Sequence, residues 1–188
     1  MLHTFVVYVE NKPGVLTRVA SLFRRRAYNI EALTVGHTEK EGVSRMTIVV
    51  DTDEFGARRL EAHLYKLVNV LLVENITPTA NVARDLALIK VATNHDSRSH
   101  VLQLAHVFRA RVVDVAPESI IVEITGTEDK IDGLLEVLRP YGVLEMVRTG
   151  RVAMSRGHKS NGVHAISSSA PLYADEFSQP HDDIAQSV

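Results

Sequence analysis

The segment Asn11 to Leu16 has the residue types best suited to hold a small anion. It follows an apolar run at 5–9 that predicts a buried strand, and it precedes apolar residues at helical spacing. Pro13 pre-sets the backbone dihedral of a first helical turn, and Gly14 leaves the N–H groups of that turn uncovered. An open helix N-terminus of this kind suits a carboxylate. A plain strand-to-helix turn accounts for the same pattern, so both interpretations stay open at this point.

Other chemistry-bearing residues form no recognisable site. The histidines at 95, 100 and 106 surround one expected helix, but no two have the i, i+4 spacing that points metal ligands the same way. The acidic residues at 51, 53 and 54 lack the spacing of a Ca²⁺ loop, and a helix cap explains them better. Glycine patterns for phosphates or dinucleotides and the Gly-x-Ser-x-Gly elbow are missing. We therefore expect no catalytic residue and no metal site.

Four arginines on the first expected helix form the strongest basic group: Arg18, Arg24, Arg25 and Arg26. Such a group is compatible with nucleic-acid binding or protein docking. No exposed aromatic residues are interleaved with these arginines, so a solvated face that also compensates the helix dipole is favoured.

Composition narrows the class of protein. The chain has 188 residues, of which 45% are hydrophobic, a net charge of −2 and no cysteine. Disulfides and thiolate chemistry are therefore excluded, and a nucleic-acid partner is disfavoured. No apolar run is long enough to span a bilayer, and the amino terminus begins with a strand pattern instead of a signal peptide. We expect a cytoplasmic protein without membrane or nucleic-acid partners.

The first part of the chain predicts the order strand, helix, strand, strand, helix, strand. The expected ranges are strand 2–10, helix 14–26, strand 28–37, strand 43–51, helix 54–67 and strand 70–76. A turn at 39–42 separates the second and third strands, and Asp53 is a suitable cap for the second helix.

The same order repeats in the second part. The expected ranges are strand 85–93, a helix capped by Asp96 or Ser97, strands 111–115 and 119–125, a helix from Thr127 to Pro140, and one closing strand at 143–154. Two βαββαβ units predict an α+β protein of two tandem ferredoxin-like sandwiches. The expected domains are residues 1–77, a linker at 78–82 and a second domain at 83–156, followed by a disordered tail at 157–188.

Taken together, these motifs resemble a known family. They are Glu10 to Leu16, Arg18-Val19, Leu22-Phe23, Tyr28 to Glu31, Leu33 to Val35, Ser44 to Ile48, Phe108 to Ala110, Val113 to Val115, Thr125 to Thr127, and Arg148 to Gly150 with Ser155 to Gly157. Over residues 2–157 the chain is similar to the small, regulatory subunit of acetolactate synthase (acetohydroxyacid synthase), with an amino-terminal ACT domain and a second ACT-like domain.

The resemblance implies a non-catalytic subunit that binds and activates a large catalytic subunit. The complex would condense two pyruvate molecules to acetolactate, the first common step of valine, leucine and isoleucine biosynthesis. Thiamine diphosphate, Mg²⁺ and FAD would belong to the catalytic partner, and this chain would carry no cofactor. The resemblance also implies feedback inhibition through valine, sometimes leucine or isoleucine, bound to this chain.

The family's effector site maps onto two separate stretches of this sequence. Its residues here are Asn11, Gly14, Val15 and Leu16 in the first stretch, and Asn29 and Ile30 in the second. The chain departs from the family pattern with Lys12-Pro13 inside the loop and with Gly36, where other members often have alanine. A smaller residue at 36 leaves the effector preference open.

Helix length implies that this site is shared between two chains. A helix of 12–13 residues is roughly 18–20 Å long, so Gly14 and Asn29 would lie at opposite ends of one unit. One amino acid cannot touch both unless two chains pair in opposite directions. We therefore expect a two-fold homodimer, with second strands edge to edge and first helices side by side.

Two other function classes fit the sequence less well. ACT domains also occur in amino-acid-responsive transcription regulators, but this chain has no helix-turn-helix pattern and no strongly basic unit. An independent enzyme would need a cofactor motif or a nucleophile–base constellation, and neither is found.

Overall fold

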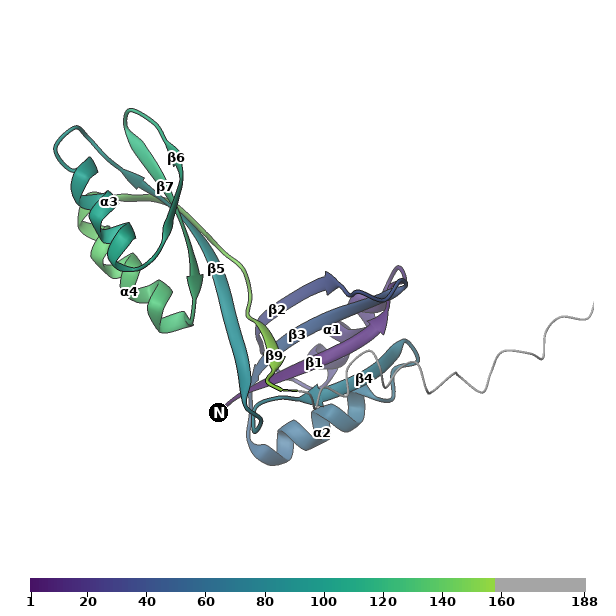
Figure 1. Ribbon diagram of the computed structural model, residues 1–188. Helices are drawn as coiled ribbons and strands as arrows, with labels where there is room; N and C mark the ends of the chain where they lie inside the picture. Colours follow the sequence, from purple (N-terminus) through teal and green to yellow (C-terminus); the bar gives the residue numbers. More distant parts are fainter. Residues whose placement is uncertain (158–188) are drawn as a thin grey trace, which may run out of the picture.

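A computed structural model describes residues 1–157 of the chain (Figure 1). The first sandwich contains β1 (Leu2–Glu10), α1 (Val15–Arg25), β2 (Ile30–His37), β3 (Val43–Asp51), α2 (Glu54–Leu64) and β4 (Val70–Asn75). Its sheet has the order β2-β3-β1-β4 with every neighbouring pair antiparallel. The expected βαββαβ order is confirmed, and α2 ends at Leu64, three residues earlier than expected.

The second sandwich repeats this arrangement. It contains β5 (Asn81–Ala92), α3 (Arg98–Val107), β6 (Arg111–Val115), β7 (Ser119–Gly126), α4 (Glu128–Leu138), the 3₁₀ turn η1 (Arg139–Tyr141), β8 (Val143–Arg148) and β9 (Val152–Ser155). The sheet order is β6-β7-β5-β8. The expected α+β class with two tandem ferredoxin-like sandwiches is confirmed.

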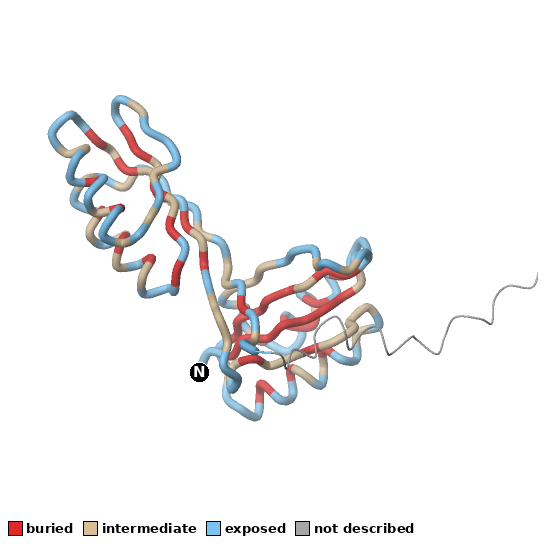
Figure 2. Tube along the Cα trace, in the orientation of Figure 1, coloured by how far each residue is buried: buried red, intermediate tan, exposed pale blue. Residues whose placement is uncertain are grey.

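Each sandwich has its own apolar core between the sheet and the two helices (Figure 2). In the first, alternate residues of β1 such as Phe5 and Val7 meet Phe23 of α1 and Leu60 of α2. In the second, Ile89 of β5 lies in one cluster with Ile131 of α4. The period-2 and helical patterns of the sequence therefore point to the correct faces.

The prediction of one closing strand over residues 143–154 is wrong. The chain leaves the second sheet after Arg148, and β9 then pairs with the first half of β5, from Asn81 opposite Ser155 to Arg84 opposite Val152. Because β5 already begins at Asn81, part of the segment expected as a linker belongs to this two-stranded ribbon. The expected tail, except Gly157, lies outside the described residues.

The ribbon of β5 and β9 packs on the sheet face of the first sandwich that the helices leave open. Ala153 of β9 is buried in a cluster with Val6, Tyr8 and Ile76. The Arg45 guanidinium lies 5.7 Å from the centre of the Tyr8 ring and donates to the Ala153 carbonyl. The second sandwich therefore supplies a strand that covers the first (Figure 1).

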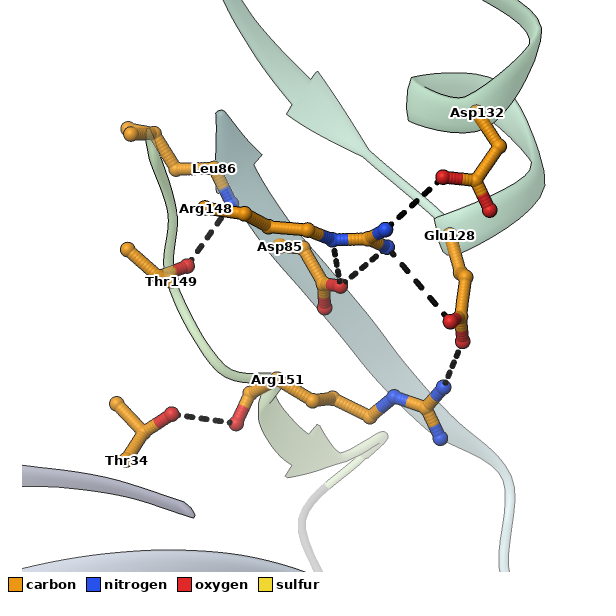
Figure 3. A network of polar contacts seen from close by, with 8 residues as sticks. All are labelled: Thr34, Asp85, Leu86, Glu128, Asp132, Arg148, Thr149 and Arg151. Carbon is orange, nitrogen blue, oxygen red and sulfur yellow. Dashed lines mark hydrogen bonds and ion pairs between the residues drawn. The ribbon is translucent and has the colours of Figure 1, made fainter. Parts of the chain in front are cut away.

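A charged network fixes the turn between β8 and β9 (Figure 3). Arg148 donates to Asp85 at 2.7 Å and to Asp132 at 3.0 Å, and Arg151 donates to Glu128 at 3.1 Å. Burial alone would lower the pKa of Arg148, but its bonds to Asp85 and the nearby carboxylates of Asp132 and Glu128 hold this pKa above its ordinary value. The network places the intervening segment, Thr149–Arg151, against β2.

Gly150 makes this approach possible. The Thr34 hydroxyl of β2 donates to the Arg151 carbonyl at 3.1 Å. A Cβ on Gly150 would lie 2.7 Å from the Thr34 hydroxyl oxygen and 3.0 Å from the Leu33 carbonyl oxygen. The Leu33 atom belongs to the backbone, so it cannot swing away as a side chain would.

We expect Gly150→Ala to loosen the packing between the two sandwiches while each one stays folded. Small-angle X-ray scattering would show a larger radius of gyration at unchanged far-UV circular dichroism. Gly36→Ala is the matched control, because nothing lies within 4 Å of a Cβ at that position. Equal scattering curves for Gly150→Ala and the unchanged chain would contradict the expectation.

Among residues 1–157, no helix is long and apolar enough to cross a membrane. In the same residues, no three His, Asp or Glu side chains gather as a metal-ion cluster would require.

Candidate functional site

The candidate site begins where β1 ends and α1 starts. The Asn11 N–H donates to the Gly42 carbonyl at 2.8 Å, and the Lys12 N–H donates to the Glu10 carbonyl at 2.9 Å. Gly14 precedes the first helical residue with φ +81°, in the left-handed region that favours glycine. The chain therefore reverses direction over four exposed residues, 11–14, and enters α1.

The start of α1 is open to a ligand. Gly14 offers no side chain to cap the helix, and within residues 1–157 the N–H groups of Leu16 and Thr17 have no hydrogen-bond acceptor. In α2 the corresponding place is occupied, because the Asp53 carboxylate accepts from the Gly56 N–H at 2.6 Å. The helix expected at 14–26 is found as α1, which begins at Val15 with Gly14 as its N-cap, and an open helix start of this kind can receive a carboxylate.

Asn69, in the turn between α2 and β4, anchors this loop. Its side-chain amide donates to the Glu10 carboxylate at 2.6 Å, and its carbonyl accepts from the Glu10 N–H at 2.9 Å. Arg18 of α1 donates to the Asn69 side-chain oxygen. The hydrogen bond from Asn69, followed by that from Lys12, lowers the pKa of Glu10 below its ordinary value. Sequence reasoning missed Asn69, because only the folded chain brings it to Glu10.

We expect Asn69→Ala to raise the pKa of Glu10 towards 4.5, the ordinary value. Because Glu10 binds protons more weakly in the folded chain, its bonds stabilise the fold above the ordinary pKa. This contribution is lost as the pH falls through the lowered pKa. The variant should therefore be the less stable protein at neutral pH, and the difference should shrink in acid. NMR titration of the Glu10 carboxyl carbon, with Asn75→Ala as control, measures this, and an unchanged Glu10 pKa would contradict it.

The six expected effector residues fall into two groups. Asn11, Gly14 and Leu16 are exposed at the start of α1, whereas the Val15 side chain is buried in the core and leaves only its backbone to the site. Asn29 and Ile30 lie beyond the other end of the helix, where the Asn29 amide donates to Glu31 at 2.6 Å.

Sheet register shows how far apart the groups are. Glu10 lies opposite Val43 of β3, and Ile30 lies opposite Val50 of the same strand. Seven residues of strand separate these positions, which is about 23 Å. The prediction that the two halves lie at opposite ends of one chain is confirmed, so no single amino acid reaches both within this chain.

The two surfaces through which a second chain would approach are exposed. β2 is an edge strand of the first sheet, and its Val35 is 44% exposed. The outer face of α1 carries a shallow depression lined by Leu16, Thr17, Ala20, Ser21 and Arg24. Small residues at the centre of this face allow close approach of another helix.

Comparison with known proteins covers both sandwiches. The family model "AHAS small subunit-like ACT domain" matches residues 5–72, and "Small subunit of acetolactate synthase" matches residues 84–157. A probable acetolactate synthase small subunit of Archaeoglobus fulgidus is 50% identical over 159 residues, or 85% of this chain and 99% of that protein. The acetolactate synthase small subunit of Mycobacterium bovis is 48% identical over 85% of this chain and 95% of its own length.

A solved structure agrees with this match. The crystal structure of the acetolactate synthase small subunit from Thermotoga maritima superposes with a TM-score of 0.79 at 39% identity, over 84% of this chain and 99% of that one. Sequence and fold thus agree over both sandwiches. The chain belongs to the family of acetolactate synthase small subunits.

Proposed function

We propose that this chain is a non-catalytic regulatory subunit. It activates a thiamine-diphosphate-dependent acetolactate synthase large subunit and makes that enzyme sensitive to valine. The observation that carries the proposal is the open start of α1 in a chain of the small-subunit family. The relatives' name "small subunit" supports a large catalytic partner for this chain as well.

The effector site is completed by a second copy of the chain. In the proposed homodimer, β2 edges pair and the outer faces of α1 lie side by side, so that Gly14 of one chain approaches Asn29 of the other. The valine carboxylate meets the open N–H groups of Leu16 and Thr17 beside Gly14. The valine ammonium group meets the side-chain oxygen of Asn11 or Asn29. Leu16 and Ile30 provide apolar surface for the side chain.

This arrangement couples effector binding to assembly. Valine contacts both chains, so it stabilises one packing of the dimer over others. Any catalytic partner that senses the dimer geometry is then regulated by linkage. The reciprocal effect follows as well, because binding of the catalytic subunit must change valine affinity by the same factor.

Co-purification with a large subunit tests the proposal. We expect a stable complex whose acetolactate formation from pyruvate exceeds that of the large subunit alone and falls when valine is added. Leucine and isoleucine in parallel assays rank the effectors. Absence of a complex, together with sequence-specific DNA binding in a mobility-shift assay, would contradict the proposal and favour a transcription regulator.

A further inference from the structure

A basic hollow lies between the two helices of the first sandwich, away from the loop at 11–16. It has a volume of about 370 Å³ and is lined by Leu22, Arg25, Arg26, His63, Lys66 and Leu67. We call it the helix groove. Two leucines provide apolar surface, every other lining residue carries a basic side chain, and none is acidic.

The cations of the helix groove are uncompensated within residues 1–157. Neither Arg25, Arg26 nor Lys66 forms a salt bridge there, whereas Arg58 on the exposed side of α2 pairs with Glu54 at 3.4 Å. The Nδ1 atom of His63 is buried without a hydrogen-bond partner in the described chain. Burial, followed by the charges of Arg26, Lys66 and Arg59, lowers the pKa of His63. The groove therefore favours an acidic occupant.

The same chain contains an acidic stretch of suitable chemistry. Residues 171–188 include Asp175, Glu176, Asp182 and Asp183, no lysine or arginine, and the aromatic residues Tyr173 and Phe177. The family model ends at residue 157, and the matched relatives cover about 85% of this chain. The acidic stretch is therefore an addition to the shared fold.

The acidic stretch is joined to the described part of the chain at a point from which it can reach the helix groove. The last described residues lie against the first sandwich, where the Arg156 N–H donates to the Ala80 carbonyl at 2.8 Å. Asp175 lies eighteen positions after Gly157, and a random chain of that many residues spans about 23 Å on average. The distance from the outer sheet face to the helix layer of one sandwich is of the order of 10–20 Å.

We propose that residues 171–188 dock in the helix groove of their own chain. Their carboxylates would pair with Arg25, Arg26 and Lys66, and an aromatic ring would cover Leu22 and Leu67. The docked segment would lie near Asn29, since Arg26 follows the last residue of α1 and precedes Asn29 by three positions. The docking does not depend on which effector the protein binds, so it can fail while the proposed function holds.

Paramagnetic relaxation tests the docking on the full chain. The chain has no cysteine, so Ala62→Cys, on the exposed side of α2 beside His63, accepts a single nitroxide label. We expect the amide signals of residues 171–188 to broaden at low salt and to recover at 1 M NaCl, where the Debye length is about 3 Å. A label at Val107→Cys, 73% exposed on α3, should leave them sharp. Sharp signals with the label at position 62 would overturn the proposal.

Charge reversal identifies the partner. Arg26→Glu with Lys66→Glu should abolish the broadening, whereas Lys90→Glu with Arg139→Glu, the same charge change in the second sandwich, should retain it. Isotope-labelled chains without a spin label can be mixed with spin-labelled chains that carry no isotope. In this mixture, broadening arises only when the segment of one chain docks on another chain. Broadening in that mixture as strong as within a single chain would contradict docking in the chain's own groove.

Discussion

Replacing Gly14 with aspartate is expected to lower valine affinity at least about 100-fold, or roughly 2.7 kcal/mol, while the fold persists. Nothing lies within 4 Å of a Cβ at this position, and aspartate tolerates the left-handed backbone better than most residues. Its carboxylate would stand at the open N–H groups of α1, where the effector carboxylate is expected. Two unit charges 4 Å apart repel by about 4 kcal/mol at an effective dielectric constant of 20, so a loss of this size is reasonable even with solvent screening.

Gly14→Asn separates charge from shape. Asparagine has nearly the same size and tolerates the same backbone, but it carries no charge. We expect calorimetry to show a much smaller loss for Gly14→Asn than for Gly14→Asp, with both variants melting near the temperature of the unchanged chain. Equal losses for the two variants would contradict electrostatic competition at this site. Unchanged valine affinity in Gly14→Asp would contradict the site itself.

Replacing Arg148 with methionine is expected to destabilise the second sandwich by about 3–5 kcal/mol. Its side chain is 23% exposed and that of Asp85 only 10%, and Arg148 Nε and Nη2 both donate to the same Asp85 oxygen, at 3.0 and 2.7 Å. Without Arg148 the Asp85 carboxylate would stay buried without its cation. Urea unfolding followed by far-UV circular dichroism measures the loss.

Arg151→Met is the matched control. Arg151 has the same side-chain exposure, but within residues 1–157 its ion pair is with Glu128, which is 53% exposed. Exposed pairs of this kind contribute about 0–1 kcal/mol. Asp85→Leu combined with Arg148→Met should cost less than the sum of the single changes, because no unpaired charge remains. A loss for Arg148→Met as small as that for Arg151→Met would contradict the role given to this network.

The sequence pattern predicted most of the fold because both sandwiches follow simple periodicity. The continuous apolar run at 5–9 predicted β1, alternating apolar residues predicted β3, and the helical spacing of apolar residues up to Phe23 predicted α1. The break between β8 and β9 was missed, because it depends on a contact between Gly150 and β2 that no local pattern contains. The start of β5 at Asn81 was missed for the same reason, since its partner β9 lies about 70 residues further along the chain.

In the candidate site, too, local sequence patterns predicted some features and missed those that depend on contacts between distant segments. Pro13 and Gly14 located the open helix start, and the length of α1 alone placed Asn29 at the far end. Asn69, which holds Glu10 in place, became visible only when the turn after α2 met the end of β1. The buried side chain of Val15 likewise depends on which face of α1 meets the sheet.

Mixed dimers show whether each effector site is built from two chains. Gly14→Asp and Asn29→His chains, each unable to bind valine as homodimers, would be unfolded together, refolded and purified as heterodimers through two different tags. In such a dimer one shared site carries both substitutions and the other carries none. We expect one valine bound per heterodimer, with near-normal affinity in calorimetry. Heterodimers that bind no valine would contradict a site shared between chains.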